Sequence, residues 1–303
     1  MVATAFCYNL IRTGSQPSDL DFDEMDRRTK DGGMSPSPEK AILVDLGWGD
    51  RKEPADLTIT TTLGITGTPM MERTGSAYLT EPRLERIPWL IHGFGTAAWT
   101  EADFGRVREW DGFRPVILDQ VHSDIIHCVA GPQNGRLEGD ALITSVPKLF
   151  LVVKTADCLP VLVADEARRV VAAVHCGWRG TWKRILEQVV GELQARYGCE
   201  PEGLLAALGP CIGPECYEVG QEVRERFEAA GFPNDIFRPN PAAAGKYFLE
   251  IRAANTLGLR RAGLRPENIL SLDACTRCRP ELLSYRRDGT AEGRMYAFIG
   301  MKA

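Results

Sequence analysis

The chain has 303 residues, of which 44% are hydrophobic and 25% are charged, and its formal net charge is −5. This is the composition of an ordinary globular protein, and it excludes collagen-like, coiled-coil and wholly disordered chains. A mildly acidic chain has no general attraction for nucleic acid or anionic lipid, and no apolar run approaches the ~18 residues needed to cross a bilayer. We therefore expect no nucleic-acid partner and no membrane partner.

The first 80 residues differ in character from the rest of the chain. Residues 13–40 contain few side chains that could join a core, so we expect them to be poorly ordered. The N-terminal sequence lacks the charged start, apolar middle and cleavage site of a secretory signal. Nine cysteines, an odd number in a long chain, fit a reducing compartment better than a disulfide framework. We predict a cytoplasmic protein with a poorly ordered extension over 1–80 and one catalytic domain over 81–303.

From about residue 85 onward, short β-like apolar runs alternate with helical patterns. The clearest helical pattern covers 181–197, and Gly198 is well placed to end that helix. Weaker helical patterns cover 220–230 and 249–262. The mixture predicts an α/β or α+β domain in which helices cover sheets. The expected strands are 87–92, 115–118, 149–155, 161–164, 170–174, 204–208, 269–272 and 295–299.

Three residues of metal-ligand type, His122, Cys158 and His175, each follow a strand-like segment. Neighbouring strands with aligned ends would bring them together at one rim of a sheet. Two imidazoles and a thiolate suit Zn²⁺, and three protein ligands leave one coordination position open for water or substrate. A single histidine or cysteine at a strand end is more often simply buried. Spacing alone therefore leaves a metal site and three buried side chains as equal alternatives.

The residues that flank these candidates favour a site. Asp157 lies next to Cys158, where the interior of a strand would not tolerate a charge. Arg179 lies near the start of the predicted long helix, where a guanidinium and peptide N–H groups could bind an anion together. Taken alone, Arg179 is better explained by a surface ion pair.

Several sequence blocks resemble the motifs of the YfiH/DUF152 family. This family has the label multicopper polyphenol oxidase, laccase domain, and its members are taken to be purine nucleoside phosphorylases with adenosine deaminase and methylthioadenosine phosphorylase activity. The resemblance runs from about His92 to the C-terminus in the family's order, and it implies a layered α-β-β-α fold with zinc held by His122, Cys158 and His175. The blocks are QVHSD (120–124), GDALIT (139–144), TADCLPVLVAD (155–165), AVHCGWRG (173–180), LGPCIGPECYEVG (208–220) and CTRCRPELLSYRRDG (275–289).

The resemblance also implies substrates and roles for individual residues. A purine nucleoside and phosphate are the expected small-molecule partners, and a water on the zinc would deaminate adenosine. Asp140 is the candidate acid/base. Arg179 with Arg286 or Arg287 are the candidate anion ligands. Ala97 stands where the family usually has an arginine, which weakens the case for phosphorolysis or moves phosphate binding to those other arginines. The oligomeric state is not predicted.

Two other enzyme classes use the same kinds of residue. Two histidines and a cysteine also match a blue-copper centre. A multicopper oxidase, however, needs many more histidines than the four in this chain, so we expect Zn²⁺ rather than Cu²⁺. The second class is a cysteine hydrolase, in which Cys158 is the nucleophile, His175 the base, and Asp157 or Asp140 orients the base.

Two weaker alternatives involve other motifs. Residues 93–98 fit the G-x-G-x-x-A pattern of a dinucleotide-binding turn, but that interpretation leaves the blocks above without a role. Cys275 and Cys278 could form a structural zinc site with Cys211 and Cys216. Because the spacing of these four cysteines is loose, we interpret them as packing thiols.

Overall fold

In a computed structural model of the chain, residues 78–303 are described except for 106–109, 111, 134 and 290–292. Most of the predicted extension over 1–80 therefore lies outside the described residues. Tyr78 and Leu79 form strand β1, which pairs with the next strand of the fold. These two residues belong to the segment that was predicted as the extension. None of its helices is long and apolar enough to span a membrane.

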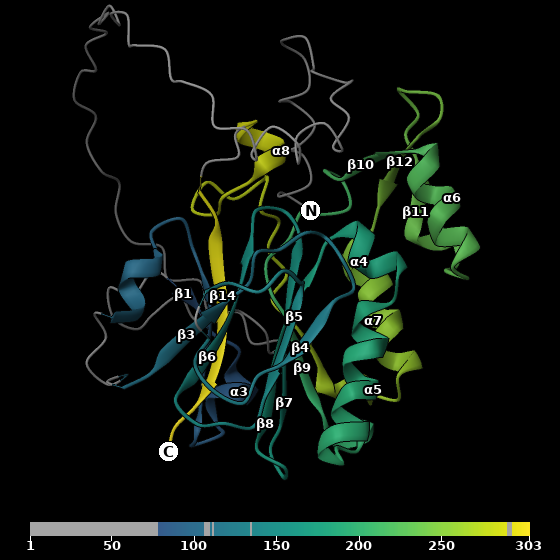
Figure 1. The fold of residues 1–303 in the computed structure, drawn as a ribbon. Helices are drawn as coiled ribbons and strands as arrows, with labels where there is room; N and C mark the ends of the chain where they lie inside the picture. Colours follow the sequence, from purple (N-terminus) through teal and green to yellow (C-terminus); the bar gives the residue numbers. More distant parts are fainter. Residues whose placement is uncertain (1–77, 106–109, 111, 134, 290–292) are drawn as a thin grey trace, which may run out of the picture. The chain divides into compact units, whose positions relative to one another are not determined.

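Two mixed sheets form the centre of the domain, and a small third sheet lies apart from them (Figure 1). The five-stranded sheet has the order β1 (Tyr78–Leu79), β2 (Leu90–Gly95), β14 (Met295–Met301), β6 (Leu149–Thr155) and β3 (Arg114–Ile117). The six-stranded sheet has the order β13 (Ile269–Ser271), β9 (Leu205–Leu208), β7 (Leu159–Asp165), β8 (Val170–Cys176), β5 (Ala141–Thr144) and β4 (Ile126–Cys128). The third sheet has the order β10 (Glu218–Gly220), β12 (Lys246–Leu249) and β11 (Phe237–Pro239).

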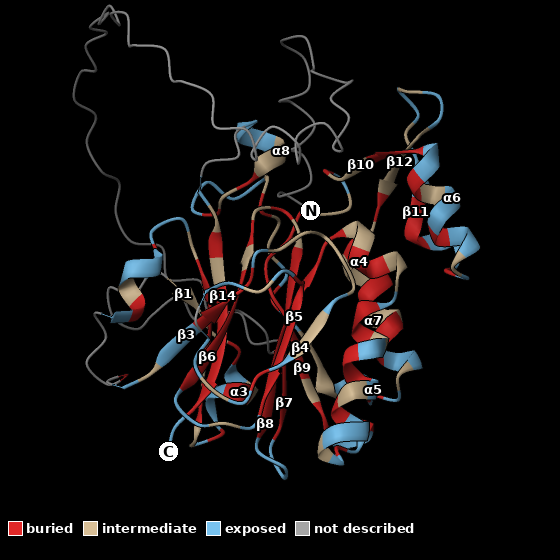
Figure 2. Ribbon diagram, in the orientation of Figure 1, coloured by how far each residue is buried: buried red, intermediate tan, exposed pale blue. Residues whose placement is uncertain are grey.

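The two large sheets pack face to face, because their central strands consist mostly of apolar residues. These strands are buried along most of their length (Figure 2). In β8, Val171 and Ala173 pack against the five-stranded sheet. The alternate residues Val170 and Ala172 pack against the helices on the other face. The helices of the domain are α3 (Pro82–Glu85), α4 (Trp178–Trp182), α5 (Ile185–Tyr197), α6 (Gln221–Ala229), α7 (Ile251–Arg261) and α8 (Tyr285–Asp288). The predicted mixed α/β layering is confirmed.

The outer face of the five-stranded sheet is covered by aromatic side chains. Phe150 of β6 and Phe298 of β14 contact each other there, with ring centroids 5.6 Å apart. The cluster also contains Phe104, which lies in the 3₁₀ helix η2 (Glu101–Gly105), and two tryptophans on either side of that helix, Trp99 and Trp110. Within the described range this layer is therefore an aromatic cluster around η2, whereas long helices cover the six-stranded sheet.

The eight predicted strands are all present, but the long helix is divided. Only the first two residues of the predicted helix over 181–197 belong to the five-residue α4 (Trp178–Trp182), and the main helix α5 begins at Ile185. Arg184 separates the two with a left-handed backbone at φ 62°. Gly198 ends α5 as predicted, in the left-handed conformation that glycine adopts without steric cost.

Candidate metal centre

The three predicted metal ligands converge on one point. His122, Cys158 and His175 each offer a donor atom, and these atoms lie within 4.8 Å of one another. The Nε2 atom of His122 is 3.9 Å from the Sγ atom of Cys158. The two imidazole rings meet edge to face, with centroids 4.9 Å apart. The structure therefore brings together all three of the residues that the sequence indicated.

The ligands lie where the two large sheets end together, not at the rim of one sheet. β3 and β6, which precede His122 and Cys158, are parallel neighbours in the five-stranded sheet. β8, which carries His175, belongs to the six-stranded sheet. Leu159 of β7 pairs with Cys176 of β8, so Cys158 lies beside the end of β8. The expectation of a single-sheet rim was wrong, because chain connections cross from one sheet to the other at this end.

Two ligand-bearing turns adopt backbone conformations that are uncommon for residues other than glycine. His122 has φ 55° and Asp157, next to Cys158, has φ 85°. Such conformations cost on the order of 1–3 kcal/mol each and persist where surrounding contacts hold them. In the 122–123 turn, the contacts come from Asp140, whose Oδ2 accepts hydrogen bonds from the backbone N and the Oγ of Ser123 at 2.5 and 2.6 Å.

Asp140 is fully buried and orients two of the ligands. Its Oδ1 accepts a hydrogen bond from Nδ1 of His175 at 2.7 Å and one from the backbone N of His122 at 3.2 Å. Because Nδ1 is used in this way, Nε2 is the His175 nitrogen that can bind a metal. Burial alone would raise the pKa of Asp140, but the hydrogen bonds and charge of His175 and the bonds from Ser123 hold that pKa below its ordinary value.

The surroundings of Cys158 favour the thiolate that a metal requires. Burial would raise the pKa of the Cys158 thiol, but His175 and His122 lower it to about 6. Burial would likewise lower the pKa of His175, whereas the Cys158 sulfur and Asp140 raise it. Since a thiolate and not a thiol is the metal ligand, this pairing prepares the sulfur for binding.

Gly177 leaves open the space that the three ligands surround. A Cβ atom built on this residue would lie 3.0 Å from Cδ2 of His122, 3.3 Å from Sγ of Cys158 and 3.6 Å from Cε1 of His175. Two imidazoles and a thiolate around this point, with a carboxylate behind one imidazole, match the donor types and outer contacts of protein metal sites. The residues present therefore fit a divalent metal ion.

A second group of polar side chains lies beside Cys158. The buried carboxylate of Asp157 accepts hydrogen bonds from Oγ1 of Thr276 at 2.5 Å and from the backbone N of Arg286 at 2.7 Å. The Arg286 guanidinium lies 5.7 Å from the centre of the Tyr217 ring. Burial and the nearby Cys158 sulfur raise the pKa of Tyr217. Sequence analysis missed Tyr217, although it lies within the LGPCIGPECYEVG block.

The remaining predicted anion ligands have different surroundings. Arg179 lies in α4, where its guanidinium stacks over the ring of Trp178 at 4.7 Å. Since α4 has only five residues and is separated from α5, Arg179 lies in a short helix of its own and not at the start of the long one. Arg287 pairs with Asp288 and directs its guanidinium into the preceding loop. There it donates hydrogen bonds to the carbonyl groups of Thr276, Arg277, Arg279 and Leu282.

The other two histidines of the chain lie outside this centre. Nε2 of His92 accepts a hydrogen bond from the backbone N of Glu81 at 2.8 Å, and burial lowers the pKa of His92 to about 4. Nε2 of His127 lies 2.8 Å from the carbonyl of Glu138. The expected dinucleotide-binding alternative also fails, because Gly93 and its neighbours lie within β2, paired with β14, and not in a turn that opens a helix.

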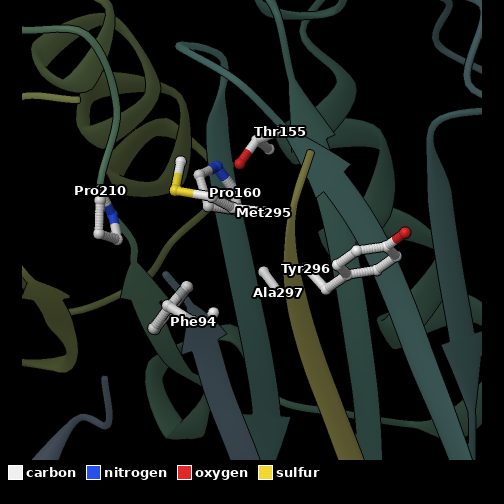
Figure 3. Close-up of a pocket in the computed structure, with 8 residues that line it drawn as sticks. Phe94, Thr155, Pro160, Pro210, Met295, Tyr296 and Ala297 are labelled. Atoms are coloured by element: carbon white, nitrogen blue, oxygen red, sulfur yellow. The ribbon is translucent and has the colours of Figure 1, made fainter. Parts of the chain in front are cut away.

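A small pocket opens beside the centre, between the end of the five-stranded sheet and two prolines (Figure 3). Thr155 and Pro160, which flank the Cys158 turn, contribute to its wall. Its volume is only about 10 Å³, which is room for a single water molecule. The other lining residues are Phe94, Gly95, Pro210, Met295, Tyr296 and Ala297.

Replacing the buried Asp140 tests whether its hydrogen bond to His175 supports metal binding. Asp140→Asn removes the negative charge behind His175 and replaces one acceptor with an amide donor. We expect metal affinity to fall about 10–100-fold, the usual effect of losing an outer partner of a metal ligand. Competition with a chromogenic chelator measures this affinity. Asp124→Asn, which changes a half-exposed partner of Lys183, is the matched control and should keep wild-type affinity. Equal affinities for the two variants would contradict the orienting role of Asp140.

Comparison with known proteins identifies the same family that the sequence motifs resemble. Residues 101–302 match the family model described as multi-copper polyphenol oxidoreductase laccase. Adenosine deaminase RL5, from an unknown prokaryotic organism, is 42% identical over a segment covering 56% of this chain and 65% of RL5. The purine nucleoside phosphorylase of Deinococcus radiodurans is 40% identical, covering 61% of this chain and 69% of that protein. Purine nucleoside phosphorylase YfiH of Escherichia coli is 38% identical, covering 61% and 73%. The match to RL5 thus spans slightly less than two thirds of that relative.

Solved structures show the same fold. YlmD from Geobacillus stearothermophilus superposes with a TM-score of 0.69 and 28% sequence identity, covering 77% of this chain and 98% of that one. The Bacillus licheniformis protein YfiH gives the same TM-score and identity over 75% and 97% of the two chains. Since the family model matches about two thirds of the sequence, the chain belongs to the multi-copper polyphenol oxidoreductase laccase family, DUF152, whose members include YfiH and YlmD.

Proposed function

We propose that this chain is a zinc-dependent purine nucleoside phosphorylase that acts on adenosine, inosine and methylthioadenosine and also deaminates adenosine. The observation that carries the proposal is the convergence of His122, Cys158 and His175 in front of the buried Asp140 carboxylate. The names of the relatives support the substrate class, since one is an adenosine deaminase and others are purine nucleoside phosphorylases. The domain over 81–303 carries this site.

The chain's own residues preorganise the centre. His122, Cys158 and His175 would hold the zinc ion, which would act as a Lewis acid. Asp140 keeps the proton of His175 on Nδ1, which presents Nε2 as the ligand. Gly177 leaves room at the point that the three ligands share. We assign Asp140 to positioning and not to proton transfer with substrate, because its oxygens face His175, the backbone of His122 and Ser123.

Arg286 and Arg179 are the proposed phosphate ligands. The positive charges of both lie near enough to Tyr217 to act on its pKa, and Tyr217 is in turn close to Cys158. Two guanidinium groups whose charges both act on Tyr217 suit a phosphate that attacks the ribose carbon. They would replace the arginine that the family usually has at the position of Ala97. Arg287 is assigned to the loop that carries Arg286, since its donors bind loop carbonyls.

Tyr217 is the proposed contact for the purine base. A phenol is protonated at neutral pH, and burial raises the pKa of Tyr217 further, so the hydroxyl can donate a hydrogen bond to a ring nitrogen as the base departs. Its ring also offers an aromatic face to the base. Tyr217→Phe is therefore expected to retain base stacking and to lose the hydrogen bond.

Arg286→Lys separates phosphate binding from the rest of the reaction. The lysine keeps one positive charge but loses the planar pair of donors. We expect KM for phosphate to rise about tenfold, because hydrogen bonds to charged groups contribute roughly 1.5–3 kcal/mol. Deamination, which uses no phosphate, should change much less. Steady-state kinetics with varied phosphate measures the effect, with the exposed Arg279→Lys as control. An unchanged KM would remove Arg286 from phosphate binding.

Product analysis tests the whole proposal. Adenosine and inosine are incubated with protein of known zinc content, with and without phosphate, and the products are separated by chromatography. Ribose 1-phosphate that forms only with phosphate identifies phosphorolysis, and inosine from adenosine identifies deamination. The absence of both products from zinc-loaded, folded protein would overturn the proposal.

A cysteine hydrolase is the second candidate, because Cys158, His175 and Asp140 form a thiol–imidazole–carboxylate series. The second imidazole, 3.9 Å from the thiol, favours the metal enzyme, since a hydrolase has no need of it. Loss of activity with a chelator and recovery with Zn²⁺ supports the metal enzyme. Inactivation by alkylation of metal-free, active protein supports the hydrolase. A multicopper oxidase is disfavoured because the two remaining histidines, His92 and His127, lie elsewhere.

A further inference from the structure

A second cluster of sulfur atoms lies outside the centre described above. Cys216, Cys275 and Cys278 place their sulfurs within 4.8 Å of one another, and those of Cys216 and Cys278 are 3.5 Å apart. Cys216 is buried, Cys275 is half-buried and Cys278 is exposed. We propose that these three cysteines form a second metal site, which binds Zn²⁺ through three thiolates with a solvent ligand on the exposed side.

The backbone around the cluster is arranged as a ligand-bearing turn. Cys275 and Cys278 have the C-x-x-C spacing that lets two sulfurs bind one ion. The backbone N of Gly213 donates a hydrogen bond to the sulfur of Cys275 at 3.2 Å, which stabilises negative charge there. The isolated bridge between Cys211 and Cys275 brings the two chain segments together, so that Cys216 reaches the turn from the other segment.

The charge of the cluster is also compensated. Three thiolates and one Zn²⁺ would have a net charge of about −1. The Arg277 guanidinium, within the C-x-x-C turn, lies 3.8 Å from the sulfur of Cys216 and offsets this charge. The sulfur of the buried Cys211 instead lies 3.3 Å from the Arg252 guanidinium and is not part of the group. The group therefore has three cysteines, whereas sequence analysis considered four and interpreted them as packing thiols.

A metal at the second site would stabilise the backbone next to Cys158 of the first site. Thr276, between Cys275 and Cys278, donates its hydroxyl hydrogen bond to Asp157, and Asp157 directly precedes Cys158. The carbonyl of Asp157 accepts a hydrogen bond from the backbone N of Ile212, on the loop that leads to Cys216. A metal that joins these two loops would hold Asp157 from both sides, so its role is structural.

Zinc stoichiometry of the full-length protein tests the proposal. The protein is produced with added zinc, purified under reducing conditions, and its metal is measured by mass spectrometry. We expect about two zinc ions per chain in the wild type and about one in Cys278→Ser. Cys158→Ser should lose the other ion, and the double variant should lose both. Cys128→Ser, at an exposed cysteine of β4, is the control and should keep both ions.

A zinc content that is the same in Cys278→Ser and in the wild type would overturn the second site while leaving the first intact. A Cys216–Cys278 disulfide in anaerobically purified protein, detected by peptide mapping without reduction, would also overturn it. Circular dichroism shows whether Cys278→Ser is folded. If it is not, cadmium-113 NMR of the wild type decides: a resonance shifted to the thiolate-rich range supports the site, and the lack of one contradicts it.

Discussion

Cys158→Ser is expected to abolish metal binding at the first centre and to lower kcat/KM by at least about 10³-fold, because the electrophilic contribution of a catalytic metal amounts to several kcal/mol. Serine is close to cysteine in size, but its hydroxyl does not ionise near neutral pH and is a poor ligand for zinc. The sulfur also has the electrostatic support of two imidazoles, which lower its pKa to about 6. Zinc analysis and steady-state kinetics on the same preparation measure the two effects together.

The control for Cys158→Ser is Cys176→Ala. Cys176 is also buried, lies one residue beyond His175 and packs into the apolar core on the opposite face of β8. It should lose stability without losing metal. Alkylation adds a second criterion, because bound zinc should protect Cys158 from iodoacetamide. Full activity of Cys158→Ser would contradict both the metal enzyme and the cysteine hydrolase.

Much of the fold could be predicted because the central strands are buried on both faces. Residues 149–153 and 170–174 are continuous apolar runs, and they lie in β6 and β8. The short strands β4 and β10 have three residues each, too few for a recognisable pattern. The break at Arg184 was also invisible, since the apolar helical rhythm continues across it and only the tertiary structure fixes its left-handed backbone.

The convergence of His122, Cys158 and His175 could be predicted because each of these residues follows an apolar run. What surrounds them could not. Asp140 was expected to move protons, but its burial behind His175 is visible only after β5 and β8 are paired. Tyr217 is remote in sequence from every metal ligand, and it reaches the site through a loop whose course no local pattern specifies. Contacts between distant segments are what sequence periodicity leaves undetermined.

Gly177→Ala is expected to weaken metal binding, and activity with it, because a Cβ atom at this position would force its neighbours to move by a few tenths of an ångström. A loss of about tenfold is the expected scale, comparable to the loss of a contact that orients a metal ligand. The backbone of Gly177, at φ −70° and ψ 168°, suits alanine, so the effect is purely one of space. The new methyl group would press on His122 at 3.0 Å and on Cys158 at 3.3 Å. Neither can withdraw, because Asp140 holds the turn of His122 and β7 begins directly after Cys158.

Gly191→Ala separates the effect of lost space at the metal from any general effect of replacing glycine. Gly191 lies in the middle of α5, and a Cβ atom there would meet nothing within 4 Å. This variant should bind metal normally and gain about 0.5–1 kcal/mol of stability, because alanine favours the helix. Isothermal titration of the metal-free proteins with Zn²⁺ gives both affinities. If Gly177→Ala bound zinc as tightly as Gly191→Ala, the ion could not lie at the point where the two imidazoles and the thiolate meet, and the placement of the reaction there would fail with it.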